Sequence, residues 1–231
     1  MSDYFNKTIN RLQHIPEVYP QYPPHTHIRI QYATKNTRQY ATAPNTSPHL
    51  PPREPTYIQY VTGIHLYYGR TIDHTILPVL NELSSEQAQP TQNTKEKPQC
   101  FMEYVHTFMK AYIGYYTSDM ILHIESDAAY LVSPKARRIV AGYFHLPDHP
   151  TITKHPKRNG AIFVECKTLR HVLSSAAKTE VAGIFHNARL GTPTRTLLHE
   201  LHHLQPPTPT KSYNSTETGF IHDNIHQKCS K

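Results

Sequence analysis

The sequence has no tryptophan, only three cysteines and no long apolar run, and these absences exclude several classes of protein. Cys100, Cys166 and Cys229 are far apart, odd in number and without C-x-x-C spacing, so they indicate reduced intracellular thiols rather than a disulfide framework. No segment approaches the ~18 apolar residues of a membrane-spanning helix, and the first residues lack a secretory signal. We therefore expect an intracellular protein, cytoplasmic or nuclear, that is not secreted.

Proline, histidine and tyrosine are abundant instead, and the chain carries excess positive charge. The 231 residues include 20 prolines, 18 histidines and 16 tyrosines, with a formal net charge of +7. This length allows one large domain or two small ones. Interleaved aromatic and basic side chains suit a nucleic-acid backbone with bases available for stacking, although a soluble basic surface explains the charge equally well.

The first 54 residues are expected to form a Pro-rich, extended or disordered lead-in. They contain segments such as PEVYPQYPPHTH and TAPNTSPHLPPREP. Proline is disfavoured in helix interiors and in central strands, so neither element should form there. Alternation of apolar and polar residues over 27–32 allows one short edge strand.

Residues 55–117 predict a small helical region, in which apolar residues recur at helical spacing. A first helix opens this region, and a second, near 74–88, can be capped by Asp73. The segment QPTQNTKEK is interpreted as a loop before a third helix around 98–110, in which Pro98 is acceptable only in the first turn. Three short amphipathic helices of this kind need a neighbouring surface, and they contain no catalytic constellation.

Residues 118–231 open with three apolar segments separated by turns, which predicts an antiparallel meander. The three strands are expected at Met120–Ser126, Ile139–Leu146 and Ala161–Lys167.

Two helices are expected after these strands, with proline and serine marking their ends. The first runs from about Ser174 to Ala188 and is capped by Ser174 or Ser175, and the second runs from Thr192-Pro193 to Leu204. A short fourth strand over Thr208–Tyr213 and a partial helix over Thr216–Ile225 follow.

Asp127, at the expected C-terminal end of the first strand, is the residue around which the second half can be organised. Two-metal phosphodiester cleavage needs three or four carboxylates that converge on two divalent cations. Glu180, in the first half of the helix after the third strand, can approach Asp127 if that helix packs across the sheet. Either acidic residue alone is more often a solvated surface group.

Three blocks in the second half carry a family resemblance: SDAAYLVSPKARRIVAGYFHL, SSAAKTEVAGIFHNA and KSYNSTETGFI. In this order they resemble the ribonuclease H region of copia-type retrotransposon polyproteins. The preceding YIQYVTGIHLYYGRTIDHTILPVLNELSSEQAQPT resembles the connection between reverse transcriptase and ribonuclease H, so the resemblance spans residues 54–231. It implies an α/β (α+β) fold with a ribonuclease H-like mixed sheet of five strands, and Mg²⁺-dependent cleavage of RNA in an RNA–DNA hybrid.

The resemblance assigns metal-binding carboxylates to Asp127 and Glu180, but Tyr213 stands where the third aspartate is expected. A phenol with a pKa near ~10 supplies no negative charge to a hard cation. Lys178 replaces an acidic residue of the family, and the sequence ends at Lys231 before the fourth carboxylate. With two of four carboxylates left, we expect a C-terminally truncated, inactive copy, a pseudoenzyme whose binding of the family cofactor Mg²⁺ is in question.

A competing motif is the string HELHH at 199–203, which matches H-E-x-x-H. In zinc peptidases two histidines one helical turn apart hold Zn²⁺, and the glutamate acts as general base. The string falls on an expected helix, and Glu217 or His222 could supply a third ligand. Histidine is so frequent in this chain that a chance match on a solvent-facing helix end is the simpler explanation.

Basic residues around the expected hairpin turns form a candidate nucleic-acid-binding set, although a solvated loop is the more common role of such residues. The pairs Tyr67-Tyr68 and Tyr115-Tyr116 resemble stacking pairs, but aromatic residues at such spacings more often belong to a core. The basic set consists of Lys135, Arg137, Arg138, Lys154, Lys157 and Arg158.

The sequence thus predicts three regions: the lead-in (1–54), the helical connection (55–117) and an incomplete ribonuclease H-like domain (118–231). The preferred interpretation is a fragment of a retrotransposon polyprotein whose ancestral activity was hydrolysis of RNA in hybrids. The alternatives are a non-catalytic nucleic-acid-binding module and, with less support, a zinc metallopeptidase. The expected partners are an RNA–DNA hybrid or another nucleic acid and other parts of the polyprotein, but no membrane.

Overall fold

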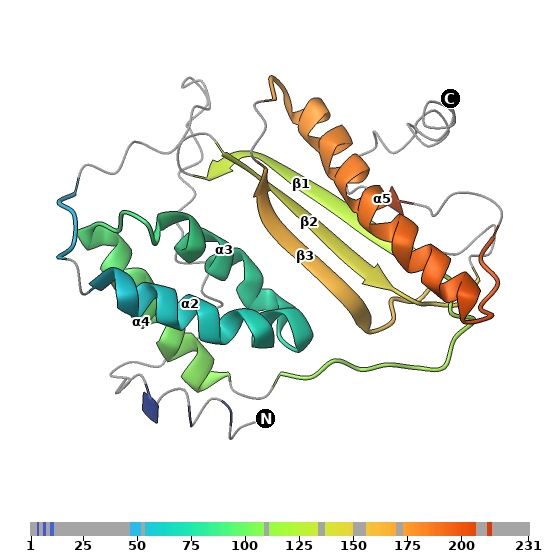
Figure 1. The fold of residues 1–231 in the computed structure, drawn as a ribbon, viewed down its shortest axis with the longest axis horizontal. Helices are drawn as coiled ribbons and strands as arrows, with labels where there is room; N and C mark the ends of the chain where they lie inside the picture. The colour runs from blue at the N-terminus through green and yellow to red at the C-terminus, as the bar shows by residue number, and fades with distance from the viewer. Residues whose placement is uncertain are drawn as a thin grey trace. The chain divides into compact units, whose positions relative to one another are not determined.

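The computed structural model divides the chain into two compact units (Figure 1). The helical unit comprises Met1–Tyr112 with Val132–Ala136, and the sheet unit comprises Ile113–Leu131 with Arg137–Lys231. The expected edge strand over 27–32 and the expected partial helix over 216–225 lie outside the described residues. The structure describes residues 4, 7, 10, 11, 47–51, 54–108, 111–133, 137–149, 156–169, 173–206 and 212–213.

The helical unit is built from α2 (Glu54–Thr71), the short 3-10 helix η2 (His74–Ile76), α3 (Leu77–Glu86) and α4 (Gln92–Thr107). The helices expected after residue 55 and near 74–88 are confirmed, and the Asp73 carboxylate caps η2 by accepting a hydrogen bond from the Thr75 N–H at 3.1 Å. Each helix contributes to one apolar core, which contains Ile58, Val61, Tyr68, Ile76, Val79, Leu80, Leu83, Phe101, Met102, Tyr104 and Val105.

The helix α4 begins six residues before the predicted start near residue 98, in the segment that the sequence indicates as a loop. The cause is a capping box, in which the Thr94 hydroxyl accepts a hydrogen bond from the Thr91 N–H at 3.1 Å. Pro98 consequently lies inside the helix rather than in its first turn, and its ring is buried. Burial of the apolar ring helps to offset the backbone hydrogen bond that proline cannot donate.

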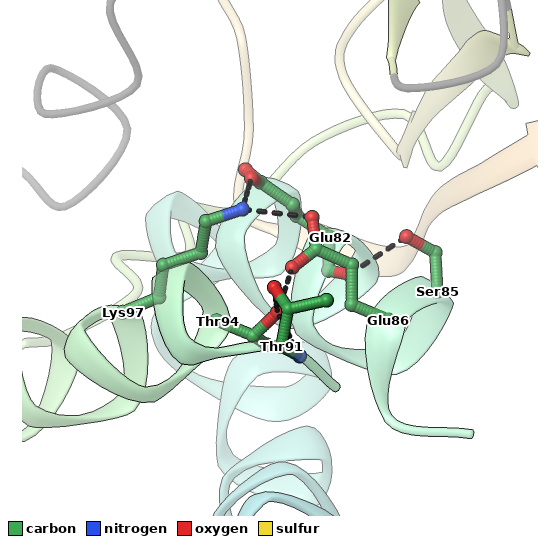
Figure 2. A network of polar contacts seen from close by, with 6 residues as sticks. All are labelled: Glu82, Ser85, Glu86, Thr91, Thr94 and Lys97. Atoms are coloured by element: carbon green, nitrogen blue, oxygen red, sulfur yellow. Dashed lines mark hydrogen bonds and ion pairs between the residues drawn. The ribbon is translucent and has the colours of Figure 1, made fainter. Parts of the chain in front are cut away.

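A polar network joins α3 to α4 (Figure 2). Lys97 Nζ donates to Glu82 Oε1 at 2.5 Å and to Glu86 Oε1 at 2.7 Å, and the Thr94 hydroxyl donates to Glu86 Oε2 at 2.9 Å. Burial lowers the pKa of Lys97, but the hydrogen bonds and charges of the two glutamates outweigh burial and hold this pKa above its ordinary value. One cation thus neutralises part of the charge of two carboxylates on successive turns of α3.

The sheet unit contains a mixed sheet with the strand order β3-β2-β1-β4. The first three strands are antiparallel, as the sequence predicts (Figure 1), whereas β4 pairs in parallel with β1, with Ile124 opposite Ser212 and Glu125 opposite Tyr213. The structure therefore confirms a mixed α/β architecture. The strands are β1 (His123–Ser133), β2 (Arg137–His145), β3 (Ala161–Leu169) and β4 (Ser212–Tyr213).

The strand β1 is longer than the predicted strand over 120–126. It continues to Ser133 through the segment AAYLV, which the sequence indicates as part of a loop. Tyrosine and valine favour extended backbone, and the longer β1 lies beside β2 along the hairpin. Asp127 therefore lies inside β1 and not at its C-terminal end.

A single helix, α5 (Ala176–Glu200), replaces the two helices predicted after β3. Ser175 is its N-cap and accepts a hydrogen bond from the Lys178 N–H at 3.2 Å. Pro193 does not end the helix, because buried residues on both sides of it, such as Gly183 and Leu198, keep the two halves packed in the same unit. Packing therefore outweighs the loss of one backbone hydrogen bond.

Candidate functional site

The helix α5 crosses β1 through small residues that allow close approach. A Cβ atom placed on Gly183 would lie 3.2 Å from Ala128 Cβ, and one on Gly191 would lie 2.3 Å from Ile124 Cδ1. The second distance is too short for any side chain, so glycine is required at position 191 unless Ile124 moves. Ile124 and Ala128 thus face α5, and the helix lies across the middle of β1.

Asp127 lies between Ser126 and Ala128, both of which face α5. The Ser126 hydroxyl accepts a hydrogen bond from Asn187 Nδ2 of α5 at 2.8 Å. Because successive side chains of a strand point to opposite faces of the sheet, the Asp127 side chain leaves β1 on the face opposite α5. It is exposed, and Asp127 Oδ1 accepts a hydrogen bond from the Ala128 N–H at 2.9 Å.

Glu180 lies near the start of α5, one turn before Gly183, and it is half-buried. Lys178, whose charge could oppose a cation at Glu180, is exposed, and its Nζ donates to the Ser174 hydroxyl at 2.9 Å. The lysine side chain is therefore tied to the N-terminal end of the helix. Glu180 belongs to α5, which covers one face of β1, whereas the Asp127 side chain lies on the other face. Packing of the helix therefore does not by itself bring the two carboxylates together.

Tyr213 lies in β4, directly beside β1 and opposite Glu125. The three sequence blocks of the family resemblance are thereby brought to neighbouring elements: the first to β1, the second to α5 and the third to β4. Tyr213 is in the strand next to the one that contains Asp127, and it carries a phenol rather than a carboxylate.

The donor set does not fit a two-metal centre. Among the described residues, no group of three or more histidine, cysteine, aspartate or glutamate side chains could hold a metal ion. Asp127 and Glu180 are two carboxylates where three or four are needed, and the residue at the third position is Tyr213. We therefore assign no catalytic step to Mg²⁺ at these residues.

The string HELHH does not form the helical pair of histidines that a zinc peptidase requires. The helix α5 ends at Glu200, and His202 has a φ of 64°, in the left-handed region. The His203 N–H donates to the Leu198 carbonyl at 2.9 Å and the His202 N–H to the His199 carbonyl at 3.0 Å, which is a Schellman motif. His199 and His203 are consequently not on successive turns of a helix, which argues against the zinc-peptidase alternative.

The basic set is only partly available for binding. Arg138 is 7% exposed, donates to the Leu173 carbonyl and lies 5.1 Å from the centre of the Tyr130 ring, so little of its side chain is open to a phosphate. The Arg138 guanidinium instead contacts groups within the sheet unit. Lys157 and Arg158 are exposed. Lys135 and Lys154 lie outside the described residues, and of Arg137 only the backbone, in β2, is described.

A corner at the start of β3 brings together residues that no sequence motif singles out. Asn159 is 5% exposed, and its side chain accepts from the Tyr116 N–H at 3.0 Å and donates to the Tyr116 carbonyl at 3.0 Å and to the Leu146 carbonyl at 2.7 Å. One amide thus ties the segment before β1 to the residues between β2 and β3. The Asn159-Gly160 dipeptide is the signal that could have identified it, because it usually marks a tight turn and here follows two basic residues.

Next to this corner, Glu125 on β1 lies between two basic side chains, those of Arg158 and His145. Arg158 pairs with it through Nε, 3.0 Å from Glu125 Oε1, and through a second guanidinium nitrogen. His145 Nε2 lies 3.5 Å from the same Oε1, and burial lowers the pKa of His145 despite the glutamate. His145 Nδ1 accepts a hydrogen bond from the Asn159 N–H at 3.2 Å, which requires that ring nitrogen to be unprotonated.

No family model, no curated protein and no solved structure matches this chain. In the described part of the chain, no helix combines the length and the apolar character needed to cross a bilayer.

Proposed function

We propose that the sheet unit is a ribonuclease H-like module, derived from a copia-type retrotransposon polyprotein, that binds an RNA–DNA hybrid or another nucleic acid without cleaving it. The observation that carries this proposal is the meeting of three sequence blocks, far apart in the chain, on β1, α5 and β4. A mixed sheet with an antiparallel β1-β2-β3 meander, followed by a helix and a parallel strand beside β1, is compatible with the fold that the resemblance implies.

Loss of cleavage is argued from the chemistry of the three family positions. Asp127 is exposed on one face of β1, Glu180 belongs to the helix that covers the other face, and Tyr213 adds no charge. A two-metal reaction needs negative charge concentrated around both cations. These positions supply too few carboxylates for that.

Retention of binding is argued from charge. The chain has a formal net charge of +7, and Lys157 and Arg158 are exposed on the sheet unit. Such cations release counterions from a phosphate backbone, which gives salt-dependent affinity without any need for a metal.

The test uses the full chain with a fluorescently labelled RNA–DNA hybrid, in the presence of Mg²⁺ or Mn²⁺. We expect salt-dependent binding and no RNA fragments, with the same result for Asp127→Asn. Cleavage that disappears in Asp127→Asn would show an active nuclease and overturn the loss of activity. Absence of binding at low salt, to the hybrid and to single strands alike, would overturn the proposed function itself.

A gain-of-function variant examines the same three positions. If the ribonuclease H-like arrangement is correct, Tyr213→Asp adds a carboxylate in the strand beside β1 and should raise Mn²⁺ affinity, measured by calorimetry, relative to the unsubstituted chain. Tyr213→Asn is the matched control, since it changes the size of the side chain in the same way without the charge. Equal affinity of the two variants would argue against the proposed arrangement.

A further inference from the structure

The corner at the start of β3 presents an aromatic ring that is both exposed and rigidly held. Tyr115 is 62% exposed, yet its hydroxyl donates to the Ala161 carbonyl at 2.7 Å. One side of the ring lies against Gly160, because a Cβ atom on that glycine would be 2.6 Å from Tyr115 Cδ1 and 2.7 Å from Cε1. The ring is therefore anchored at its hydroxyl and along one side, while much of the rest is open to solvent.

Two cations, Lys157 and Arg158, closely precede Gly160 in the chain, and other tyrosines hold them in place. Lys157 Nζ lies 5.3 Å from the centre of the Tyr116 ring, and the Tyr116 hydroxyl donates to the Lys157 carbonyl. The Arg158 guanidinium lies 5.2 Å from the centre of the Tyr143 ring, and the Tyr143 hydroxyl donates to the Asn159 carbonyl at 3.0 Å. Contacts of this kind restrict long basic side chains that would otherwise be mobile.

The two cations differ in their availability. Arg158 is 63% exposed in its side chain but is paired with Glu125, so part of its charge is compensated. Lys157 is exposed, and among the described residues no carboxylate forms an ion pair with it. Lys157 is therefore the group best placed to contact a phosphate, and Arg158 adds unused N–H donors beside it.

We propose that Tyr115, Lys157 and Arg158 form a binding surface for single-stranded nucleic acid, in which a base stacks on Tyr115 and the adjacent phosphate contacts Lys157. A rigid aromatic ring beside cations is the combination that binds single strands with little sequence preference. The bases of a duplex are stacked on one another, so only an unpaired base presents its face to the ring. The inference rests on the proposed function only in that both require binding of nucleic acid.

The test measures fluorescence anisotropy of labelled oligothymidylate and oligouridylate with the full chain at several salt concentrations. Tyr115→Ala should weaken binding about tenfold or more, since stacking on one aromatic side chain contributes roughly that factor. Tyr115→Phe keeps the ring and should bind nearly as well as the unsubstituted chain. Tyr67→Ala removes a tyrosine that is 68% exposed on α2, in the helical unit, and it should leave affinity unchanged.

Two further variants separate stacking from charge and from misfolding. Lys157→Gln should reduce the slope of log affinity against log salt by about 0.7, the value for one phosphate contact on a single strand. Gly160→Ala should also weaken binding, because its Cβ atom would meet Tyr115 and would lie 2.7 Å from the Gly114 carbonyl oxygen, which displaces the ring. Circular dichroism of each variant establishes that the fold is kept.

The outcomes distinguish this inference from the proposed function. If the chain binds the hybrid but not single strands, or if Tyr115→Ala binds single strands as tightly as the unsubstituted chain, the Tyr115 surface is wrong and the proposed function stands. If the chain binds neither kind of nucleic acid, both fail. Weakened single-strand binding in Tyr115→Ala and Gly160→Ala, with Tyr67→Ala unaffected, supports the surface.

Discussion

Asn187 of α5 and Ser126 of β1 are joined by a hydrogen bond in the interior of the sheet unit, with Nδ2 2.8 Å from the hydroxyl oxygen. The same Nδ2 donates to the Ala141 carbonyl of β2 at 2.9 Å, so one amide connects the helix to two strands. Asn187 is fully buried and Ser126 is 3% exposed. Gly142 makes room for the amide, because a Cβ atom there would lie 2.4 Å from Asn187 Oδ1.

Substitution of Asn187 by alanine should destabilise the sheet unit by about 2–4 kcal/mol. The change leaves a cavity and removes the donor from two buried acceptors. Urea unfolding followed by circular dichroism measures the loss. Thr196→Ala is the matched control, because Thr196 is exposed on the same helix and alanine favours helix. A loss in Asn187→Ala no larger than in Thr196→Ala would contradict the role given to the amide.

The sequence predicts the elements around this bond better than it predicts their limits. The meander of three strands follows from apolar segments separated by turns, and the parallel strand beside β1 falls within the segment expected to be extended. The continuity of α5 through Pro193 could not be predicted, because it depends on packing of Gly191 and Leu198 in the folded unit. A proline signal is local, whereas the packing that overrides it is not.

The candidate site likewise depends on the folded backbone. The string HELHH satisfies the spacing of a zinc motif, but where a helix ends depends on backbone geometry that spacing does not encode. Asp127 and Glu180 could be identified as separate carboxylates, yet which face of β1 each one occupies required the positions of Ser126 and Ala128. Tyr115 was identifiable only as one member of an aromatic pair.

His202→Gly should stabilise the sheet unit by about 1 kcal/mol. His202 occupies the left-handed position of the Schellman motif with a φ of 64°, where glycine has no Cβ penalty. Thermal unfolding measures the gain. Leu201→Gly, one residue earlier at a φ of −81°, should instead reduce stability or leave it unchanged, since that backbone conformation does not favour glycine. Equal effects of the two glycines would contradict this assignment.

Lys97→Met should destabilise the helical unit by about 1–3 kcal/mol at neutral pH, because it leaves Glu82 and Glu86 facing each other on α3 with 15% and 17% exposure. Urea unfolding measures this change. Lys95→Met, at an exposed position of the same helix, is the control.

A triple variant tests whether the charges of Glu82 and Glu86 cause the loss of stability in Lys97→Met. Combining Lys97→Met with Glu82→Gln and Glu86→Gln removes both the cation and the like charges. The triple variant should recover much of the stability lost in Lys97→Met at neutral pH. A triple variant less stable than Lys97→Met would mean that the glutamates stabilise α3 in some way other than by pairing with Lys97.

Stability of the helical unit should decrease as the pH falls from about 6.5 toward 4, because of His65. This side chain is fully buried, and burial lowers its pKa to about 4, although the Val61 carbonyl, 2.8 Å from Nδ1, partly opposes the shift. The folded-state pKa lies below the unfolded value, so the unfolded chain binds a proton first on acidification and the stabilisation present above pH 6.5 is lost, by about 2 kcal/mol at pH 5. Urea unfolding should show a weaker pH dependence in His65→Gln than in His199→Gln, which alters an exposed histidine. An identical pH dependence of the two variants would exclude His65 as its source.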